Sequence, residues 1–213
     1  MEEELLRIFD KDRNAIGTES RHEVHKYGYW HETFHCWFVS SDEETEYIYL
    51  QIRSASKKDY PNLLDITAAG HLLATETVTD GTREVEEELG IGISFKELIP
   101  LGIIDYSIVN GELIDKELAN VYVYNSPISM KDFILQAEEV SGVVRTPFKS
   151  FADLWTGKSN ELEIEGFEVD EAGKRTLVNK LVKKDSFVPH ENTYYEKVIE
   201  GISTIISSRK SLI

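Results

Sequence analysis

The chain has 213 residues, of which 39 are Asp or Glu and 23 are Lys or Arg, and its formal net charge is −16. This charge argues against a general nucleic-acid or anionic-membrane surface, because both surfaces need clustered Lys and Arg. The opening Met1–Glu4 is acidic where a signal sequence is basic, no apolar run has membrane-spanning length, and the single cysteine, Cys36, cannot form an intramolecular disulfide, so we expect a cytoplasmic protein.

Hydrophobic patterning predicts a mixture of strands and helices along the first 156 residues. Runs rich in aromatic and β-branched residues predict strands at residues 5–9, 15–18, 30–39, 47–53, 93–104 (one or two strands, broken at Pro100), 118–124 and 140–144. Capping signals and helical spacing predict helices at residues 20–28, 77–90 and 148–155, the last with Ser150 as its cap. Strands interleaved with helices indicate an α/β (α+β) fold in which a mixed sheet packs against helices.

The composition changes after the first 156 residues, and no further motif is recognisable. Residues 167–169 and 176–178 flank a turn and predict a hairpin, and residues 192–207 predict a helix. The apolar stripe of that helix consists of Tyr195, Val198, Ile199, Ile202 and Ile206. We expect the stripe to pack on the rest of the chain, with a dimer contact as the alternative. The prediction is therefore a domain at 1–156 and an extension at 157–213, in a monomer or homodimer.

The most informative segment is the acidic helix predicted near residues 77–90. Glu84, Glu87 and Glu88 share one face of this helix, because positions i, i+3 and i+4 lie on the same side. The opposite, apolar face is formed by Val78, Val85 and Leu89. Three neighbouring carboxylates repel one another, and Mg²⁺, which prefers oxygen ligands, would relieve that repulsion. The alternative is a solvated acidic face without a metal.

This segment resembles the Nudix box, the signature of the Nudix hydrolase family. Gly70 and Glu76 are separated by five residues, and residues 83–91 (REVEEELGI) match the second half of the pattern at every fixed position. Six residues, 77–82, lie between the two halves, whereas the family pattern has seven. The resemblance implies an α/β/α sandwich with a mixed β-sheet and a Mg²⁺-dependent (or Mn²⁺-dependent) hydrolase that cleaves a diphosphate linkage in a small molecule.

The preceding part of the chain also resembles the type I isopentenyl-diphosphate isomerases. The similar residues include Asp10, Asp12, Arg21, His25, His31, Phe34, residues 51–54, residues 56–61 and residues 69–71. The resemblance implies that His25, His31 and His71 bind a second divalent metal together with Glu117 and Asp115. Imidazole and carboxylate ligands suit Mn²⁺ or Zn²⁺. For any single histidine, an ordinary hydrogen-bonding role is the alternative.

One position departs from the isomerase pattern. The family's catalytic cysteine precedes a Gly-His pair, and Ala69 stands there in this chain. Allylic isomerisation needs an acid and a base at the double bond, and a methyl group can transfer no proton. Cys36 lies in a different predicted strand and is expected to be a small core residue. The sequence therefore favours hydrolysis over isomerisation.

Two sets of acidic residues are candidates for the general base. Glu87 and Glu88 are expected to be metal ligands first and base candidates second. Glu139 and its neighbour Glu138 enter a predicted strand that in Nudix proteins can border the site, and a solvated turn is their alternative role. We name Glu87, Glu88 and Glu139 as the catalytic candidates.

Basic residues complete the predicted site. Arg83 is expected to pair with a carboxylate, for which Glu76 is one candidate. Arg53, Lys57 and Lys58 can contact phosphate groups, or they can form a solvated basic loop. The leading prediction is thus a pyrophosphohydrolase, with an isomerase-like enzyme and a non-catalytic sensor of diphosphate ligands as the alternatives.

Overall fold

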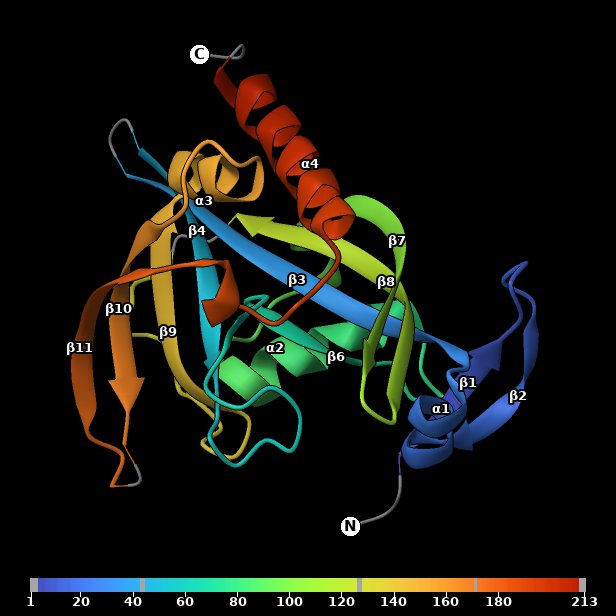
Figure 1. The fold of residues 1–213 in the computed structure, drawn as a ribbon. Coiled ribbons are helices and arrows are strands. Elements are labelled where there is room, and N and C mark those ends of the chain that lie inside the picture. The colour runs from blue at the N-terminus through green and yellow to red at the C-terminus, as the bar shows by residue number, and fades with distance from the viewer. Residues whose placement is uncertain (1–3, 43–44, 126–127, 171, 211–213) are drawn as a thin grey trace.

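A computed structural model describes residues 4–42, 45–125, 128–170 and 172–210 (Figure 1). Its strands are β1 (Leu5–Phe9), β2 (Ala15–Ser20), β3 (Trp30–Asp42), β4 (Thr45–Arg53), β5 (Leu64–Asp65), β6 (Ala68–His71), β7 (Leu98–Asn110), β8 (Leu113–Asn125), β9 (Val140–Pro147), β10 (Leu162–Val169) and β11 (Arg175–Val182). Its helices are α1 (Arg21–Tyr27), α2 (Thr82–Leu89), α3 (Phe148–Trp155) and α4 (Asn192–Lys210), with 3₁₀ turns η1 (Val78–Gly81), η2 (Phe95–Glu97) and η3 (Lys184–Ser186).

The described strands form one sheet around the long strand β3. The main path runs β11-β10-β9-β4-β3-β1-β2, and β6 and β8 also pair with β3. The β3–β8 ladder is parallel, from Trp30 opposite Lys116 to Val39 opposite Asn125, whereas the β3–β4 and β3–β6 ladders are antiparallel. This mixture of directions confirms the mixed sheet expected from the sequence.

Alternate residues of β3 supply two cores on opposite faces of the sheet, because side chains along a strand point to alternating sides. Trp37 and Val39 belong to the core that also contains α3 and α4, whereas Cys36 and Phe38 belong to the core that contains Val85 and Leu89 of α2. Figure 1 shows α4 and α2 on opposite sides of β3. Helices therefore cover both faces of the sheet, as the expected α/β/α arrangement requires.

The C-terminal elements are part of this architecture. β10 pairs with β9 over four residues, and β11 continues the sheet beyond β10. Tyr194 and Tyr195 of α4 are buried in the same core as Trp37 and Trp155. The rings of Trp155 and Tyr195 stack with centroids 3.6 Å apart. The predicted hairpin and helix are both present, and both are longer than the sequence patterns indicated.

Three local predictions need correction. The segment broken at Pro100 in the prediction is one strand, β7, which keeps pairing with β8 across a register shift between Pro100 and Gly102. Ser150 lies inside α3, whose N-cap is Pro147. The helix predicted at residues 77–90 starts later: Thr77 and Asp80 cap the turn η1, and α2 begins only at Thr82. Among the described residues, no helix has the length and apolar character needed to cross a membrane.

Candidate active site

A cavity of about 820 Å³ opens where β6, α2, β8 and the loop after β4 meet the segment before α4. Its lining contains ten Asp and Glu residues and five Lys and Arg residues. An anionic ligand would be repelled from such a lining unless cations bound with it, because like charges in a poorly hydrated site interact strongly. Every site residue predicted from the sequence except His31 contributes to this lining.

Glu84, Glu87 and Glu88, which the sequence places on one helix face, differ in how deeply they are buried. Val85 and Leu89 are fully buried and fix α2 on the sheet. On the opposite side, the Glu84 side chain is 12% exposed and Glu88 is buried, whereas the Glu87 side chain is 55% exposed. Glu84 and Glu88 are therefore held inside the cavity wall, and Glu87 lies at its rim.

Strand β6 holds the two buried carboxylates in place. The amide of Ala69 donates to Oε2 of Glu88 at 3.2 Å, and the side chain of Gln51 donates to the same oxygen at 3.2 Å. A Cβ atom on Gly70 would lie 2.2 Å from Cδ of Glu84. The glycine of the motif is thus required by the close approach of the Glu84 carboxylate to the β6 backbone.

Arg83 connects the two halves of the motif. Its Nε donates to Glu76 at 2.5 Å, and its Nη1 pairs with Glu84 at 2.7 Å and with Glu87 at 3.2 Å. Its Nη2 also donates to the carbonyl oxygen of His71 at 3.0 Å. Glu76 is therefore the carboxylate partner that the sequence suggested, and Arg83 ties α2 to β6.

The pKa values of the two buried glutamates of α2, Glu84 and Glu88, are raised. Burial raises the pKa of the Glu84 carboxyl to about 7, with Arg83 opposing this shift and Glu87 adding to it. Burial and then the charge of Glu84 raise the pKa of Glu88 well above its usual range, against the opposing charge of Lys57. Both carboxyls would release their protons if a divalent cation compensated their charge.

A second group of ligands lies beside the first. The metal-ligand atoms of His25, His31 and His71 lie within 4.8 Å of one another. Nδ1 of His25 is 2.7 Å from the carbonyl oxygen of Arg21, and Nδ1 of His31 is 3.1 Å from the carbonyl oxygen of Tyr29. A carbonyl oxygen only accepts, so both rings carry a proton on Nδ1 and keep Nε2 free as a metal ligand.

Asp115 completes this histidine cluster. Its Oδ1 lies 3.4 Å from Nε2 of His25 and 3.5 Å from Nε2 of His31. Nε2 of His31 and Oδ1 of Asp115 are buried atoms that have no hydrogen-bond partner among the described residues. Burial, followed by the charge of His71, lowers the pKa of His31 to about 4, so this ring is neutral near pH 7. The lone pairs of these two atoms lie close together and no hydrogen-bond donor meets them, which is the arrangement that a divalent cation would satisfy.

Glu117 lies next to His31 and Asp115 of the same cluster. The ligand atoms of His31, Asp115 and Glu117 lie within 4.8 Å of one another. One Glu117 oxygen, Oε2, receives hydrogen bonds from Thr33 at 2.7 Å and from Tyr106 at 2.8 Å, and Nε2 of His35 lies 2.9 Å from it. Burial would raise the pKa of Glu117, but His35 and then His31 hold it well below its usual range, so the group is a carboxylate.

The basic loop residues predicted to meet phosphate are mostly paired with acids. Arg53 bonds Asp65 at 2.8 Å, and Lys57 pairs with Glu139. Asp65 also accepts from Nε2 of His190 at 2.9 Å. Lys58 is exposed and has no carboxylate partner among the residues that the structure describes. The loop therefore brings little uncompensated positive charge to the cavity.

Several residues of the site were not found from the sequence, among them His35, Tyr106, Asp65 and His190. These residues belong to strand β3, strand β7, strand β5 and the segment before α4, respectively. Their partners are far away in the chain, as in the contact between His190 and Asp65, which are 125 positions apart. No local spacing could have signalled such pairs.

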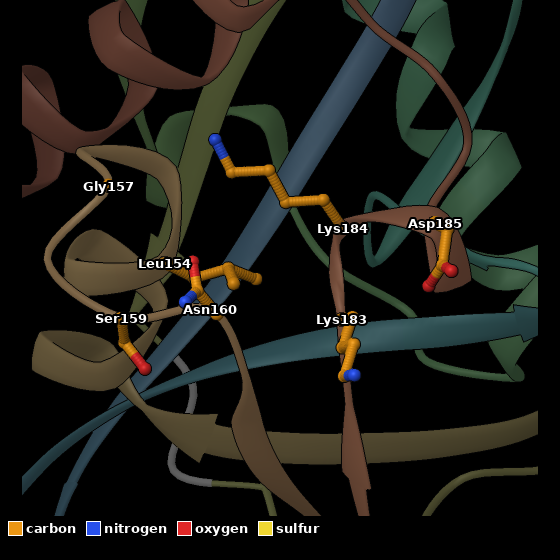
Figure 2. Close-up of a pocket in the computed structure, with 7 residues that line it drawn as sticks. All are labelled: Leu154, Gly157, Ser159, Asn160, Lys183, Lys184 and Asp185. Atoms are coloured by element: carbon orange, nitrogen blue, oxygen red, sulfur yellow. The ribbon is translucent and has the colours of Figure 1, made fainter.

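A smaller hollow of about 390 Å³ lies between the end of α3 and the turn η3 (Figure 2). Figure 2 shows its two lysines, Lys183 and Lys184, pointing away from each other. Lys184 bonds the carbonyl oxygen of Trp155 at 3.4 Å and the side chain of Asn192 at 3.3 Å. The candidate catalytic and metal-ligating side chains therefore lie at the large cavity.

Comparison with known proteins supports the motif. The chain is 40% identical over 202 residues to an uncharacterised Nudix hydrolase of Clostridium acetobutylicum, covering 95% of this chain and 98% of that protein. It is 33% identical over 159 residues to Nudix hydrolase 3 of Arabidopsis thaliana, covering 71% of this chain and 20% of that protein. It is 32% identical over 122 residues to an isopentenyl-diphosphate Delta-isomerase of Serratia proteamaculans, covering 57% and 65% of the two chains.

Solved structures agree on the fold. A protein from Deinococcus radiodurans aligns with a TM-score of 0.53 at 21% identity, covering 72% of this chain and 90% of that chain. A MutT/nudix family protein from Enterococcus faecalis aligns with a TM-score of 0.52 at 12% identity, covering 83% and 62% of the two chains. No family model matches the chain. The extent of the first sequence match confirms the resemblance drawn from Gly70 and residues 83–91: this chain belongs to the Nudix hydrolase family.

Proposed function

We propose that this protein is a divalent-metal-dependent pyrophosphohydrolase that cleaves a diphosphate linkage in a small molecule. The observation that carries the proposal is the placement of β6 between two sets of ligands. Ala69 and Gly70 contact Glu88 and Glu84 on one side, and His71 joins His25 on the other. Two neighbouring cation sites would suit a substrate with two linked phosphates.

Each set has its own metal preference in this proposal. Glu84 and Glu88, with Glu87 at the rim, would hold Mg²⁺ or Mn²⁺ through oxygen ligands. The histidine cluster, with Asp115 and Glu117, would hold a second divalent metal that accepts nitrogen ligands. When bound, such cations neutralise phosphate oxygens and lower the pKa of a coordinated water.

The side chains at the rim supply the remaining functions. Glu87 is more exposed than the other two glutamates and would take a proton from a water molecule on giving up its contact with Arg83, and Glu139 in the cavity lining is the second base candidate. Lys57 neutralises Glu139 in the free protein. Lys58 would contact the phosphate groups directly, and Arg53 and Lys57 would do so once these groups replace their present carboxylate partners.

The test is a screen with Mg²⁺ and with Mn²⁺ over nucleoside diphosphates, nucleotide sugars, dinucleoside polyphosphates and prenyl diphosphates, in which chromatography detects the phosphorylated products of diphosphate cleavage and any inorganic phosphate. On the best substrate, we expect Glu84→Gln and Glu88→Gln to lower kcat/KM by more than the roughly 10- to 100-fold typical of groups that only support a metal ligand. Glu86→Gln is the matched control, because Glu86 is an exposed glutamate on the same helix. Equal activity in all three variants would refute the assignment.

The same screen addresses the two alternatives. Ala69 lines the cavity where the isomerase family has its cysteine, and Cys36 is fully buried in the core with a raised pKa. We therefore expect isopentenyl diphosphate to yield no dimethylallyl product. Formation of that product without phosphate release would instead support the isomerase. Tight binding of one diphosphate without turnover would support a sensor.

A further inference from the structure

A buried hydrogen-bond chain connects the C-terminal helix to the histidine cluster. The hydroxyl of Tyr194 in α4 lies 3.2 Å from Nε1 of Trp37 and 2.8 Å from Nδ1 of His35. Nε2 of His35 lies 2.9 Å from Oε2 of Glu117. Tyr194 and Trp37 are fully buried and His35 is 2% exposed, so these contacts are shielded from bulk solvent.

With a neutral His35, one arrangement of these hydrogen bonds gives every donor in the chain an acceptor. The indole Nε1–H of Trp37 can only donate, so the Tyr194 oxygen accepts from it. The Tyr194 hydroxyl proton is then directed to Nδ1 of His35, which accepts. The remaining ring proton of His35 lies on Nε2 and is donated to Glu117. Tyr194 thus selects the tautomer of His35 that can bond to Glu117.

These hydrogen bonds determine which oxygen of Glu117 can bind a cation. Its Oε2 already accepts from Thr33 and Tyr106, and the bond from His35 makes three donors on one oxygen. A carboxylate oxygen with three donors has no lone pair left for a cation. Oε1 is therefore the atom that remains available next to His31 and Asp115.

We propose that Tyr194 is a positioning residue for the second metal site: through His35 it orients Glu117 so that a single oxygen faces the cation. This inference rests on the second metal site in the proposed function. It makes the segment after residue 156 a structural part of the site. Partners that orient metal ligands in this way typically contribute 10- to 100-fold in metal affinity.

The test measures Mn²⁺ binding to the full chain by calorimetry, without substrate. The component of the isotherm that His31→Gln removes reports the histidine cluster. We expect Tyr194→Phe to weaken that component about 10- to 100-fold. Tyr195→Phe is the matched control, because Tyr195 is the adjacent buried tyrosine of α4 and its hydroxyl donates only to the carbonyl oxygen of Val188, at 3.1 Å. We expect Tyr195→Phe to stay within about twofold of the unmodified protein.

A second readout separates positioning from general loosening of α4. In ¹⁵N-histidine spectra, His35 should show a protonated Nε2 and a hydrogen-bonded Nδ1, and Tyr194→Phe should change the Nδ1 resonance while Tyr195→Phe does not. Equal loss of Mn²⁺ affinity in both tyrosine variants, or no loss in Tyr194→Phe, would overturn the proposal.

The control variant His31→Gln also separates this inference from the proposed function. If it leaves Mn²⁺ binding unchanged, the second metal site is absent and the positioning role fails with it. Glu84-dependent phosphate release would then show that the hydrolase survives without that site.

Discussion

Gly70 shows how one missing side chain permits the acidic site. Its Cα lies so close to α2 that an added Cβ would approach all three atoms of the Glu84 carboxylate within 2.4 Å. The backbone on this side is fixed by the pairing of Gly70 with Phe34. The carboxylate is the far end of a flexible side chain, so it, and not the strand, would move.

We therefore expect Gly70→Ala to leave the protein folded and to lower kcat/KM on the best substrate by at least about 10-fold, because the displaced Glu84 can no longer serve as a ligand. Melting temperature and steady-state kinetics measure the two effects. Gly92→Ala is the control, since no atom lies within 4 Å of the Cβ position there. Full activity of Gly70→Ala would mean that the position of Glu84 is unimportant.

The raised pKa of Glu84 predicts a pH-dependent stability. Its folded-state pKa of about 7 exceeds the ordinary value of 4.5, so the folded protein binds more protons than the unfolded chain between these values. Stability must then fall as the pH rises from about 4.5 to 7, by about 3 kcal/mol from this group alone. Divalent cations should restore it, because they compensate the ionised carboxylate.

Denaturant unfolding in EDTA at pH 5 and pH 7.5 measures this effect. We expect Glu84→Gln to reduce the fall, with the part that remains coming from Glu88, whose pKa is also raised, and we expect Mg²⁺ to raise the free energy of unfolding of the unmodified protein more at pH 7.5 than at pH 5. Glu86→Gln, on the exposed face, should behave as the unmodified protein. Parallel pH curves for all three proteins would contradict the buried, proton-binding Glu84.

At the scale of elements, local patterns predicted the strands and helices but not how they meet. The acidic helix follows from residues close in sequence, and it ends at Gly90, which adopts a left-handed conformation. The parallel pairing of β3 with β8, in contrast, joins residues about 86 positions apart, such as His31 and Glu117. Only this pairing places Glu117 beside the histidines, and periodicity carries no information about it.

The six-residue loop of the motif keeps the two halves of the motif together. The six residues between the two halves form the capped turn η1 and lead directly into α2. Glu76 still reaches Arg83 through two hydrogen bonds, at 2.5 and 2.9 Å. The two halves of the motif are therefore in contact across the six-residue loop.

At the scale of the whole molecule, the core on one face of the sheet depends on the end of the chain. Phe187, Tyr194, Tyr195, Val198 and Ile202 are buried among the side chains of β3, β4 and α3. Burying five such side chains contributes on the order of 10 kcal/mol. That is comparable with the entire net stability of a typical domain. The sequence predicted a domain at 1–156 with an extension at 157–213 packed on it, and we expect from this energy that the extension is needed for folding.

A fragment of residues 1–156 tests whether the later segment is needed for folding. Without the C-terminal segment, Trp37, Phe151 and Trp155 would lose the ring contacts that Tyr194, Tyr195 and Phe187 provide. We expect the fragment to show no cooperative thermal unfolding, weak near-ultraviolet circular dichroism and strong binding of a hydrophobic dye. The full chain with Leu177→Ser is the control, because Leu177 is 90% exposed and its loss should leave the cooperative transition intact. A fragment that unfolds cooperatively near the temperature of the full chain would instead show that the first 156 residues are an independent domain.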